Sequence, residues 1–286
     1  MARIDELAIE PIGTEALPEA VALTLEANWN QTPDDWGFFF VHGTVFGARD
    51  AEGKLVASAA LLPYSAGFSW ISLVIVAKAH RGRGLGTRML NECLAVLRER
   101  NWVGMLDATQ AGSRIYGPLG FKPIFGLKRW EGIGNAAPVR VDPGHDDPVQ
   151  PLGISGIQRV ARFDAAAFGA KRDALLADFC SRTGTNGFEL EARNGYALMR
   201  PGRVAAQLGP VVAANENDAL ILLEAALVST PGNVFVDVPD VWTGMTTRLG
   251  ARGFRVQRPF LRMAIGRDMP YGDPPQVFAI AGPEYG

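Results

Sequence analysis

The stretch RGRGLGT at residues 81–87 is basic and glycine-dense, and these are the residue types of an anion-binding loop. It follows the apolar run 68–77 and precedes a segment with helical apolar spacing, so it joins a strand to a helix. A helix start offers unpaired backbone N–H groups and the positive end of a dipole, and glycine lets a ligand come close to the backbone. Gly82, Gly84 and Gly86 are more glycine than a turn requires. We therefore favour an anion site over an ordinary turn with solvated arginines.

Two other phosphate-binding motifs share these glycines but have a different spacing. Asp107 lies about 20 residues after the glycine loop, where a dinucleotide-binding unit has an acidic residue. In such a unit, however, the G-x-G-x-x-G fingerprint directly follows the strand. Here the residues from Ala77 to Arg81 intervene, and the order of the glycines differs. A Walker loop requires Gly-Lys-Ser/Thr, which does not occur in the sequence.

The composition predicts a packed protein without a nucleic-acid footprint. Hydrophobic residues make up 48% of the 286 residues and the net charge is -2. The 2 cysteines and 3 histidines have no spacing typical of a disulfide framework or a metal site, so we expect no metal. The first residues carry acids and no apolar core of a signal peptide, and no window is apolar for long enough to span a membrane. We expect a cytoplasmic protein that binds neither nucleic acid nor membrane, and a homodimer remains open.

The spacing of apolar residues predicts alternating helices and strands in the first half. Helices are predicted over 16–30, 86–100 and 112–120, and strands over 37–49, 54–65, 68–77, 102–108 and 121–132. A segment rich in Pro, Gly and Asp follows at 133–153 and has no periodicity, so we interpret it as a linker.

The second half repeats the first in a weaker form. Residues 208–229 give strand, loop and helix like 73–97, and residues 234–263 parallel 105–130, with Asp237 in the place of Asp107. A repeat at a period of about 130 residues predicts two α/β domains, 1–132 and 154–286. The second loop, AANENDA, has no glycine and carries two acids, so this copy is expected to be degenerate and to bind no phosphate.

At these residues the sequence resembles a known family. RGRGLG matches the R-x-x-G-x-G/A signature of the GNAT acetyltransferase superfamily, with Arg81, Gly84 and Gly86 at the marked positions. AGSRIYGPLGF resembles the family's second motif, a tyrosine, here Tyr116, five residues before a Gly-Phe that opens a strand. The whole chain resembles a bacterial subgroup with two GNAT-type domains in tandem. The resemblance implies the α+β GNAT fold, in which a mixed central sheet is flanked by helices.

The resemblance also implies a reaction. The protein would be an N-acetyltransferase that moves an acetyl group from acetyl-CoA to an amine by direct attack in a ternary complex. The loop residues implied to bind the pyrophosphate are Arg81, Gly82, Arg83, Gly84, Leu85, Gly86 and Thr87. The backbone N–H groups implied to face the thioester are those of Val74, Ile75 and Val76. Tyr116 occupies the position of the tyrosine that protonates the leaving thiolate.

The sequence does not single out one general base or one acceptor. The strand 68–77 contains no carboxylate, so Asp107 is the candidate base, with Asp34, Asp35 or a water chain as alternatives. The family's acceptor loop falls on NWNQTPDDW, residues 28–36. The candidate acceptor contacts in that loop are Trp29, Asn30, Asp35 and Trp36, although the two tryptophans would serve equally well to close the core. A small amine, an amino acid, an antibiotic or a peptide amine would all suit as acceptor.

A different class of function also fits the sequence. A regulatory protein could hold acyl-CoA without turning it over. Tyr116 favours catalysis, whereas the lack of an obvious base favours this alternative.

Overall fold

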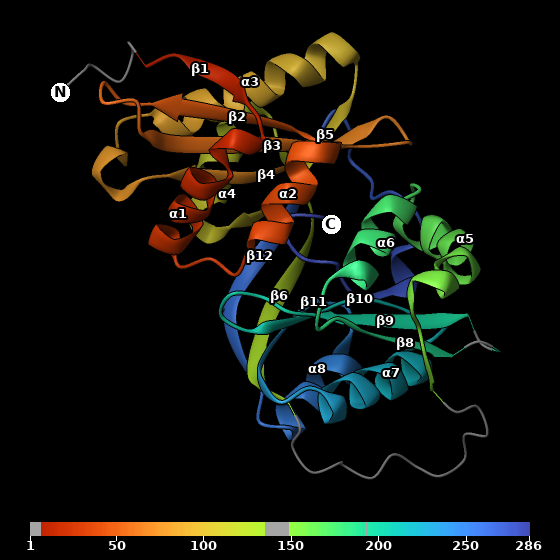
Figure 1. Ribbon diagram of the computed structural model, residues 1–286. Helices are drawn as coiled ribbons and strands as arrows, with labels where there is room; N and C mark the ends of the chain where they lie inside the picture. Colours follow the sequence, from red (N-terminus) through yellow and green to blue (C-terminus); the bar gives the residue numbers. More distant parts are fainter. Residues whose placement is uncertain (1–6, 135–148, 191, 193) are drawn as a thin grey trace.

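The computed structural model describes residues 7–134, 149–190, 192 and 194–286. In this part of the chain, 13 strands form one mixed sheet that helices flank (Figure 1), which confirms the predicted fold class. The strands of the first half are β1 (Ile9–Ile12), β2 (Thr44–Arg49), β3 (Leu55–Tyr64), β4 (Phe68–Val76), β5 (Val103–Thr109) and β6 (Lys122–Gly134). Those of the second half are β7 (Gln150–Pro151), β8 (Asn186–Leu190), β9 (Gly195–Arg200), β10 (Ala206–Val212), β11 (Gly232–Pro239), β12 (Arg255–Ile265) and β13 (Val277–Ala279).

The helices follow the same division. The first half contains α1 (Leu17–Ala27), α2 (Pro33–His42), α3 (Leu85–Arg100) and α4 (Gln110–Tyr116). The second half contains α5 (Ile157–Phe168), α6 (Asp173–Ser181), α7 (Glu216–Ser229) and α8 (Thr243–Ala251). Most of the predicted linker, residues 135–148, lies outside the described residues.

One predicted strand is wrong. The aromatic run at the start of the segment 37–49 belongs to α2, and only its end forms β2. The side chain of Thr32 caps α2 by accepting the N–H of Asp35, and the Asp35 carboxylate accepts the N–H of Thr32 at 2.7 Å. Pro33 fits the first helical turn, and the helix buries Trp36 and Phe39. The capping box therefore prevails over the β-propensity of the aromatic residues.

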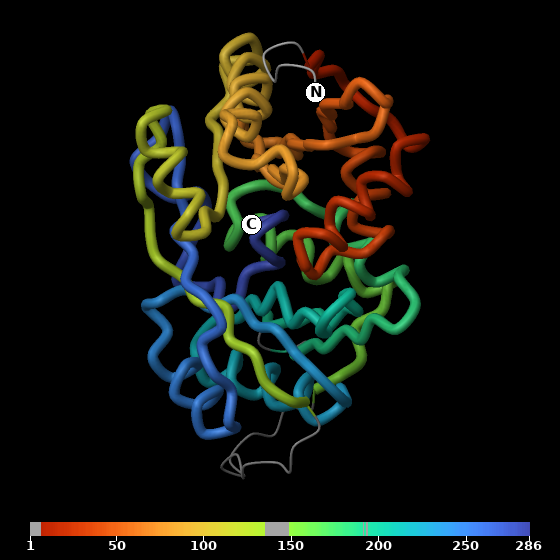
Figure 2. Tube along the Cα trace, turned by 90° about the vertical axis from the view of Figure 1, so that its left-hand side faces the viewer, coloured from red at the N-terminus to blue at the C-terminus, as the bar shows by residue number. Residues whose placement is uncertain are grey.

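The two halves exchange strands. In the sheet order β1-β2-β3-β4-β5-β12-β6-β11-β10-β9-β8-β7, strand β12 of the second half lies between β5 and β6 of the first half. Strand β6 in turn lies between β12 and β11 and is antiparallel to both. The two strands run side by side between the halves (Figure 2). The backbone hydrogen bonds of one sheet therefore continue across the whole molecule.

The last ten residues, 277–286, form a segment that we call the closing segment, and it lies in the middle of the molecule (Figure 2). Tyr285 is fully buried, and its ring stacks on Phe39 of α2 with centroids 5.4 Å apart. Phe179 of α6 meets the same ring edge-on at 5.1 Å. The core of the first half therefore extends into α6 and the closing segment.

Candidate active site

Strands β4 and β5 run parallel but pair over only a short length. Their register pairs are Phe68 with Val103, Ser69 with Gly104 and Trp70 with Met105. Beyond Trp70 the two strands part. A gap between parallel strands at their carboxyl ends is a common place for a ligand in α/β proteins.

A bulge in β4 lies beside this gap. Ser72 pairs with Ala60 and Ile75 pairs with Ser58, so two residues of β4 face one residue of β3. One of them, Leu73, has a φ of 53°, which is unusual for a residue other than glycine. Its carbonyl accepts the hydroxyl of Ser58 at 2.8 Å. The bulge takes Leu73 and Val74 out of the regular pairing with β3, on the side where β4 and β5 part.

The gap holds a cavity of about 110 Å³, which we call the reaction cavity. Its polar lining side chains are Asn30, Gln31, Ser72, Asp107, Thr109, Tyr116, Arg129, Arg258 and Glu284. The apolar lining comes from Trp29, Ile71, Leu73, Val74, Leu106, Phe260 and Pro283. Several of these residues belong to the second half, so both halves build the cavity.

Tyr116 lines the reaction cavity from the end of α4. Burial, with a smaller contribution from the Cys93 thiol, raises the pKa of Tyr116 to about 12. The hydroxyl is therefore protonated at neutral pH. A protonated hydroxyl beside the parted strands can donate a proton or a hydrogen bond.

Asp107, the candidate base, also lines the cavity, but an arginine of the second half binds both its oxygens. The Arg262 guanidinium donates to Oδ1 at 2.9 Å and to Oδ2 at 2.8 Å. Burial raises the pKa of Asp107, and the Arg262 charge opposes that shift. Arg262 lies on β12, so the strand exchange creates this ion pair.

Glu284 is a second buried acidic residue in the lining of the reaction cavity, and no motif in the sequence predicts it. It is 7% exposed, and its Oε1 accepts Nη2 of Arg200 at 3.0 Å. Among the described residues, Oε2 has no hydrogen-bond partner although it is buried. Burial raises the pKa of Glu284 against the opposing charge of Arg200. Only the path of the closing segment brings this residue to β4, where Ser72 donates its hydroxyl to the Glu284 carbonyl.

The glycine loop lies where the sequence predicts it, between β4 and α3. Residues 81–84 are exposed, and α3 begins at Leu85 with Gly84 as its N-cap. The first N–H groups of a helix have no carbonyl acceptor within the helix. Gly82 and Gly84 have φ values of 73° and 83°, and a Cβ at either would meet open space. The loop can therefore approach an anion with its backbone, as a pyrophosphate requires.

The other predicted contacts divide into two groups. Trp29 and Asn30 line the reaction cavity, and the Asn30 amide donates to the carbonyl of Ala205 at 3.0 Å. Asp35 and Trp36 do not line it. Trp36 is fully buried and donates its indole N–H to Thr24, as expected of a core tryptophan.

Asp35 is buried in a polar cluster between the halves. Its Oδ1 accepts Nη1 of Arg182 at 2.6 Å and the hydroxyl of Tyr285 at 2.8 Å. Burial raises the pKa of Asp35, but the Arg182 and Arg200 charges and the Thr32 N–H together outweigh that effect, so the pKa lies below its usual range. Val74 lines the cavity, whereas Ile75 and Val76 pair with β3.

Known proteins show the same architecture. Residues 8–121 match the model of the acetyltransferase (GNAT) family, and residues 160–279 match a second acetyltransferase (GNAT) domain model. The chain is a two-domain member of the GNAT superfamily. It is 29% identical over 254 residues to holothin acyltransferase of Pseudoalteromonas sp., covering 87% of this chain and 84% of the relative.

Solved structures share the two-domain GNAT fold. A Pyrococcus horikoshii protein described as an acetyltransferase superposes with a TM-score of 0.82 at 20% identity, covering 98% of this chain and 96% of its own. A tandem GNAT protein from the clavulanic acid biosynthesis pathway gives a TM-score of 0.64 at 15% identity, covering 91% of this chain and 98% of its own.

The second GNAT domain has the same parting of strands, but the chain itself fills the gap. Strands β10 and β11 pair in parallel only from Ala206 to Leu208. Beyond that point β13 pairs with β10, and the N–H of Ile280 donates to the carbonyl of Asp237 on β11 at 3.0 Å. A Cβ on Gly209 would collide with the Ile280 carbonyl. The closing segment thus occupies the place that corresponds to the reaction cavity.

The start of α7 also differs from that of α3. Asn215 caps it, and Glu216 and Asp218 lie in its first turn. These acids oppose the binding of a phosphate at that helix end.

In the part of the chain that the structure describes, no group of His, Cys, Asp and Glu could hold a metal ion. The described helices also include none of the length and apolar character that a bilayer crossing requires.

Proposed function

We propose that this GNAT protein transfers an acyl group, acetyl in the simplest case, from coenzyme A to an amine by direct attack in a ternary complex. The observation that carries the proposal is the reaction cavity in the gap between β4 and β5, with Tyr116 in its wall. The exposed glycine loop at the start of α3 would bind the pyrophosphate. The backbone of Leu73 and Val74 would face the thioester. The similarity to holothin acyltransferase supports turnover rather than storage of acyl-CoA.

The reaction needs one proton acceptor and one proton donor. The neutral amine attacks the thioester carbonyl, a C–N bond forms, and the C–S bond breaks. The amine loses one proton to a base, and the departing thiolate takes one proton from an acid, so that free CoA thiol and an amide result. Tyr116 would supply the proton to the sulfur, as its protonated hydroxyl allows.

Two carboxylates could accept the amine proton. Arg262 engages both oxygens of Asp107, whereas Oε2 of Glu284 has no hydrogen-bond donor among the described residues. A base must offer a free lone pair to the proton that it removes. We therefore assign this role to Glu284 and assign to Asp107 the positioning of Arg262.

The test is release of free CoA thiol from a panel of acyl-CoA esters with a panel of amines. Acetyl-CoA is expected to react, and comparing its kcat/KM with those of longer esters will define the acyl group. Amide product should form in equal amount to the thiol. If acetyl-CoA binds but no amine in the panel releases thiol, the alternative of a regulatory acyl-CoA-binding protein is supported instead.

A further inference from the structure

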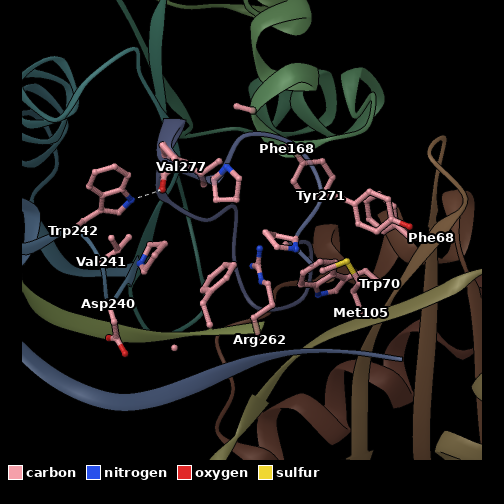
Figure 3. Close-up of a pocket in the computed structure, with 18 residues that line it drawn as sticks. Phe68, Trp70, Met105, Phe168, Asp240, Val241, Trp242, Arg262, Tyr271 and Val277 are labelled. Atoms are coloured by element: carbon pink, nitrogen blue, oxygen red, sulfur yellow. Dashed lines mark hydrogen bonds between the residues drawn. The ribbon is translucent and has the colours of Figure 1, made fainter. Parts of the chain in front are cut away.

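A second and larger cavity lies between the two domains (Figure 3), and we call it the aromatic cavity. Its volume is about 290 Å³. Six aromatic side chains contribute to its lining: Phe68, Trp70, Phe125, Phe168, Trp242 and Tyr271. In Figure 3, Trp242 and Val277 stand on one side and Phe68 and Tyr271 on the other. A cavity of 150 Å³ holds a benzene molecule, so this one can hold about two rings.

The charged groups of the aromatic cavity already have partners. Arg262 is paired with Asp107, and its guanidinium lies 4.6 Å from the ring centre of Trp70. Asp240 is paired with Lys128 at 2.7 Å. A strongly charged ligand would find no free counter-charge on these side chains. The lining fits a flat, neutral ring system, which would gain from burial of apolar surface and from contact with ring faces.

The aromatic cavity and the reaction cavity share their walls. Trp70 lines the first, and Ser72, two residues along the same face of β4, lines the second. Two residues of a strand span about 7 Å. The ion pair between Arg262 and Asp107 also has one member in each cavity. The indole N–H of Trp70 donates to the Pro283 carbonyl at 2.9 Å, so the closing segment and the Arg262–Asp107 pair together form the wall between the two cavities.

We propose that the aromatic cavity binds the ring system of the acceptor, so that the acceptor is an amine carried on a short chain from a flat apolar ring. This inference rests on the proposed acyl transfer at the reaction cavity, and it names the acceptor class. The amine would point toward the wall that Arg262 and Asp107 form between the two cavities, while the rings remain between Trp242 and Tyr271.

The experiment compares 2-naphthylmethylamine with propylamine, because both are primary aliphatic amines but only one carries rings. We expect kcat/KM for the naphthyl amine to be higher by about tenfold or more, as burial of this much apolar surface allows. 2-Naphthalenemethanol, which lacks the amine, should compete with the acceptor but not with acetyl-CoA. Its binding should also change the fluorescence of the tryptophans.

Val241→Trp places a large side chain at the rim of the aromatic cavity, on a residue that is 70% exposed. It should lower kcat/KM for the naphthyl amine by about tenfold or more, the amount that ring burial contributes, and leave propylamine and the KM for acetyl-CoA unchanged. Val41→Trp is the matched control, because Val41 is equally exposed, at 70%, and lines neither cavity. It should change none of these values.

The results separate this inference from the proposed function. Equal kcat/KM for the two amines, or an equal effect of Val241→Trp on both, would overturn the aromatic acceptor while acyl transfer stands. If no amine is acylated but 2-naphthalenemethanol binds, and Val241→Trp prevents that binding, the cavity is a ring-binding site and the proposed transfer to amines fails. Absence of both acylation and binding would overturn both.

Discussion

Replacing Glu284 by glutamine tests the assignment of the base. Glutamine keeps the length of the side chain and an oxygen that can accept Nη2 of Arg200. It removes the negative charge and the ability to take up a proton. The carbonyl of Glu284 would still accept the Ser72 hydroxyl, so the closing segment should keep its path along β4.

The expected loss of kcat in Glu284→Gln follows from the proposed role of Glu284 as the general base. Loss of a general base lowers kcat by about 100- to 10,000-fold. Loss of the charge also weakens a buried ion pair, a change that costs about 3–5 kcal/mol when the partner is left alone. Here Arg200 retains the Gly209 carbonyl at 3.2 Å and the ring of Phe179 at 4.3 Å, so we expect the cost to be about 3 kcal/mol or less. The variant should therefore remain folded at assay temperature.

The decisive assay is the pH dependence of kcat/KM with an electron-poor aniline such as 3-nitroaniline, whose amine becomes protonated only below the pH range of the assay. A base works only when deprotonated, so wild-type activity should fall as the pH falls through the pKa of Glu284. Burial and Asp35 raise that pKa, while Arg200 on β9 and Arg129 on β6 oppose the rise. Because the pKa lies above the usual range for glutamate, the acidic limb should lie above about pH 4.3. Glu284→Gln should abolish this limb and leave the affinity for acetyl-CoA unchanged.

Glu189→Gln provides the control. Glu189 is 3% exposed and paired with Arg159 at 2.7 Å, but it lies on β8 and lines neither cavity. It should lower stability without changing the pH profile. If Glu284→Gln keeps the wild-type acidic limb and loses only stability, Glu284 is a structural partner of Arg200 and the reasoning is refuted.

Three further changes test other parts of the site. Tyr116→Phe should lower kcat by about 100- to 10,000-fold with acetyl-CoA affinity unchanged, and wild-type turnover with a verified acceptor would reduce Tyr116 to a packing residue. A Cβ at Gly86 would lie in ordinary contact, 3.6 Å from Val76, so Gly86→Val should fold but weaken acetyl-CoA binding at least about tenfold in calorimetry. The wild type should show one site per chain, and two equivalent sites would contradict the filled gap of the second domain. Asp35→Asn should cost about 3 kcal/mol or less of unfolding free energy in urea at pH 7, because it removes one carboxylate partner of Arg182, which keeps its second partner Asp178 at 2.7 Å. Since the folded-state pKa of Asp35 is lowered, the difference from wild type should shrink below about pH 4, and a pH-independent difference would contradict this account.

The sequence by itself predicted most of the local elements and the residues that we propose for the cofactor side of the site. The glycine loop, the helix after it and the tyrosine before Gly-Phe are contiguous motifs, because backbone approach to a phosphate depends on neighbouring residues. Their order along the chain was enough to recognise two GNAT-type domains. The sequence also predicted that the second loop, AANENDA, binds no phosphate, because its two acids lie within the loop itself. The capping box of Thr32 and Asp35 indicates a helix start, but the aromatic residues after it favoured the prediction of a strand.

Only the tertiary structure shows which residues of the second half join the reaction cavity, where we propose that the acceptor reacts. Asp107 meets Arg262 because β12 crosses to the first half, and the register of such a strand depends on distant backbone pairing rather than on local pattern. Glu284 reaches the cavity because β13 fills the gap of the second domain and directs the closing segment onto β4. No local period of the sequence encodes contacts more than 200 residues apart. Each half matches a GNAT model, and the exchange of strands between them lets residues of both halves line one cavity.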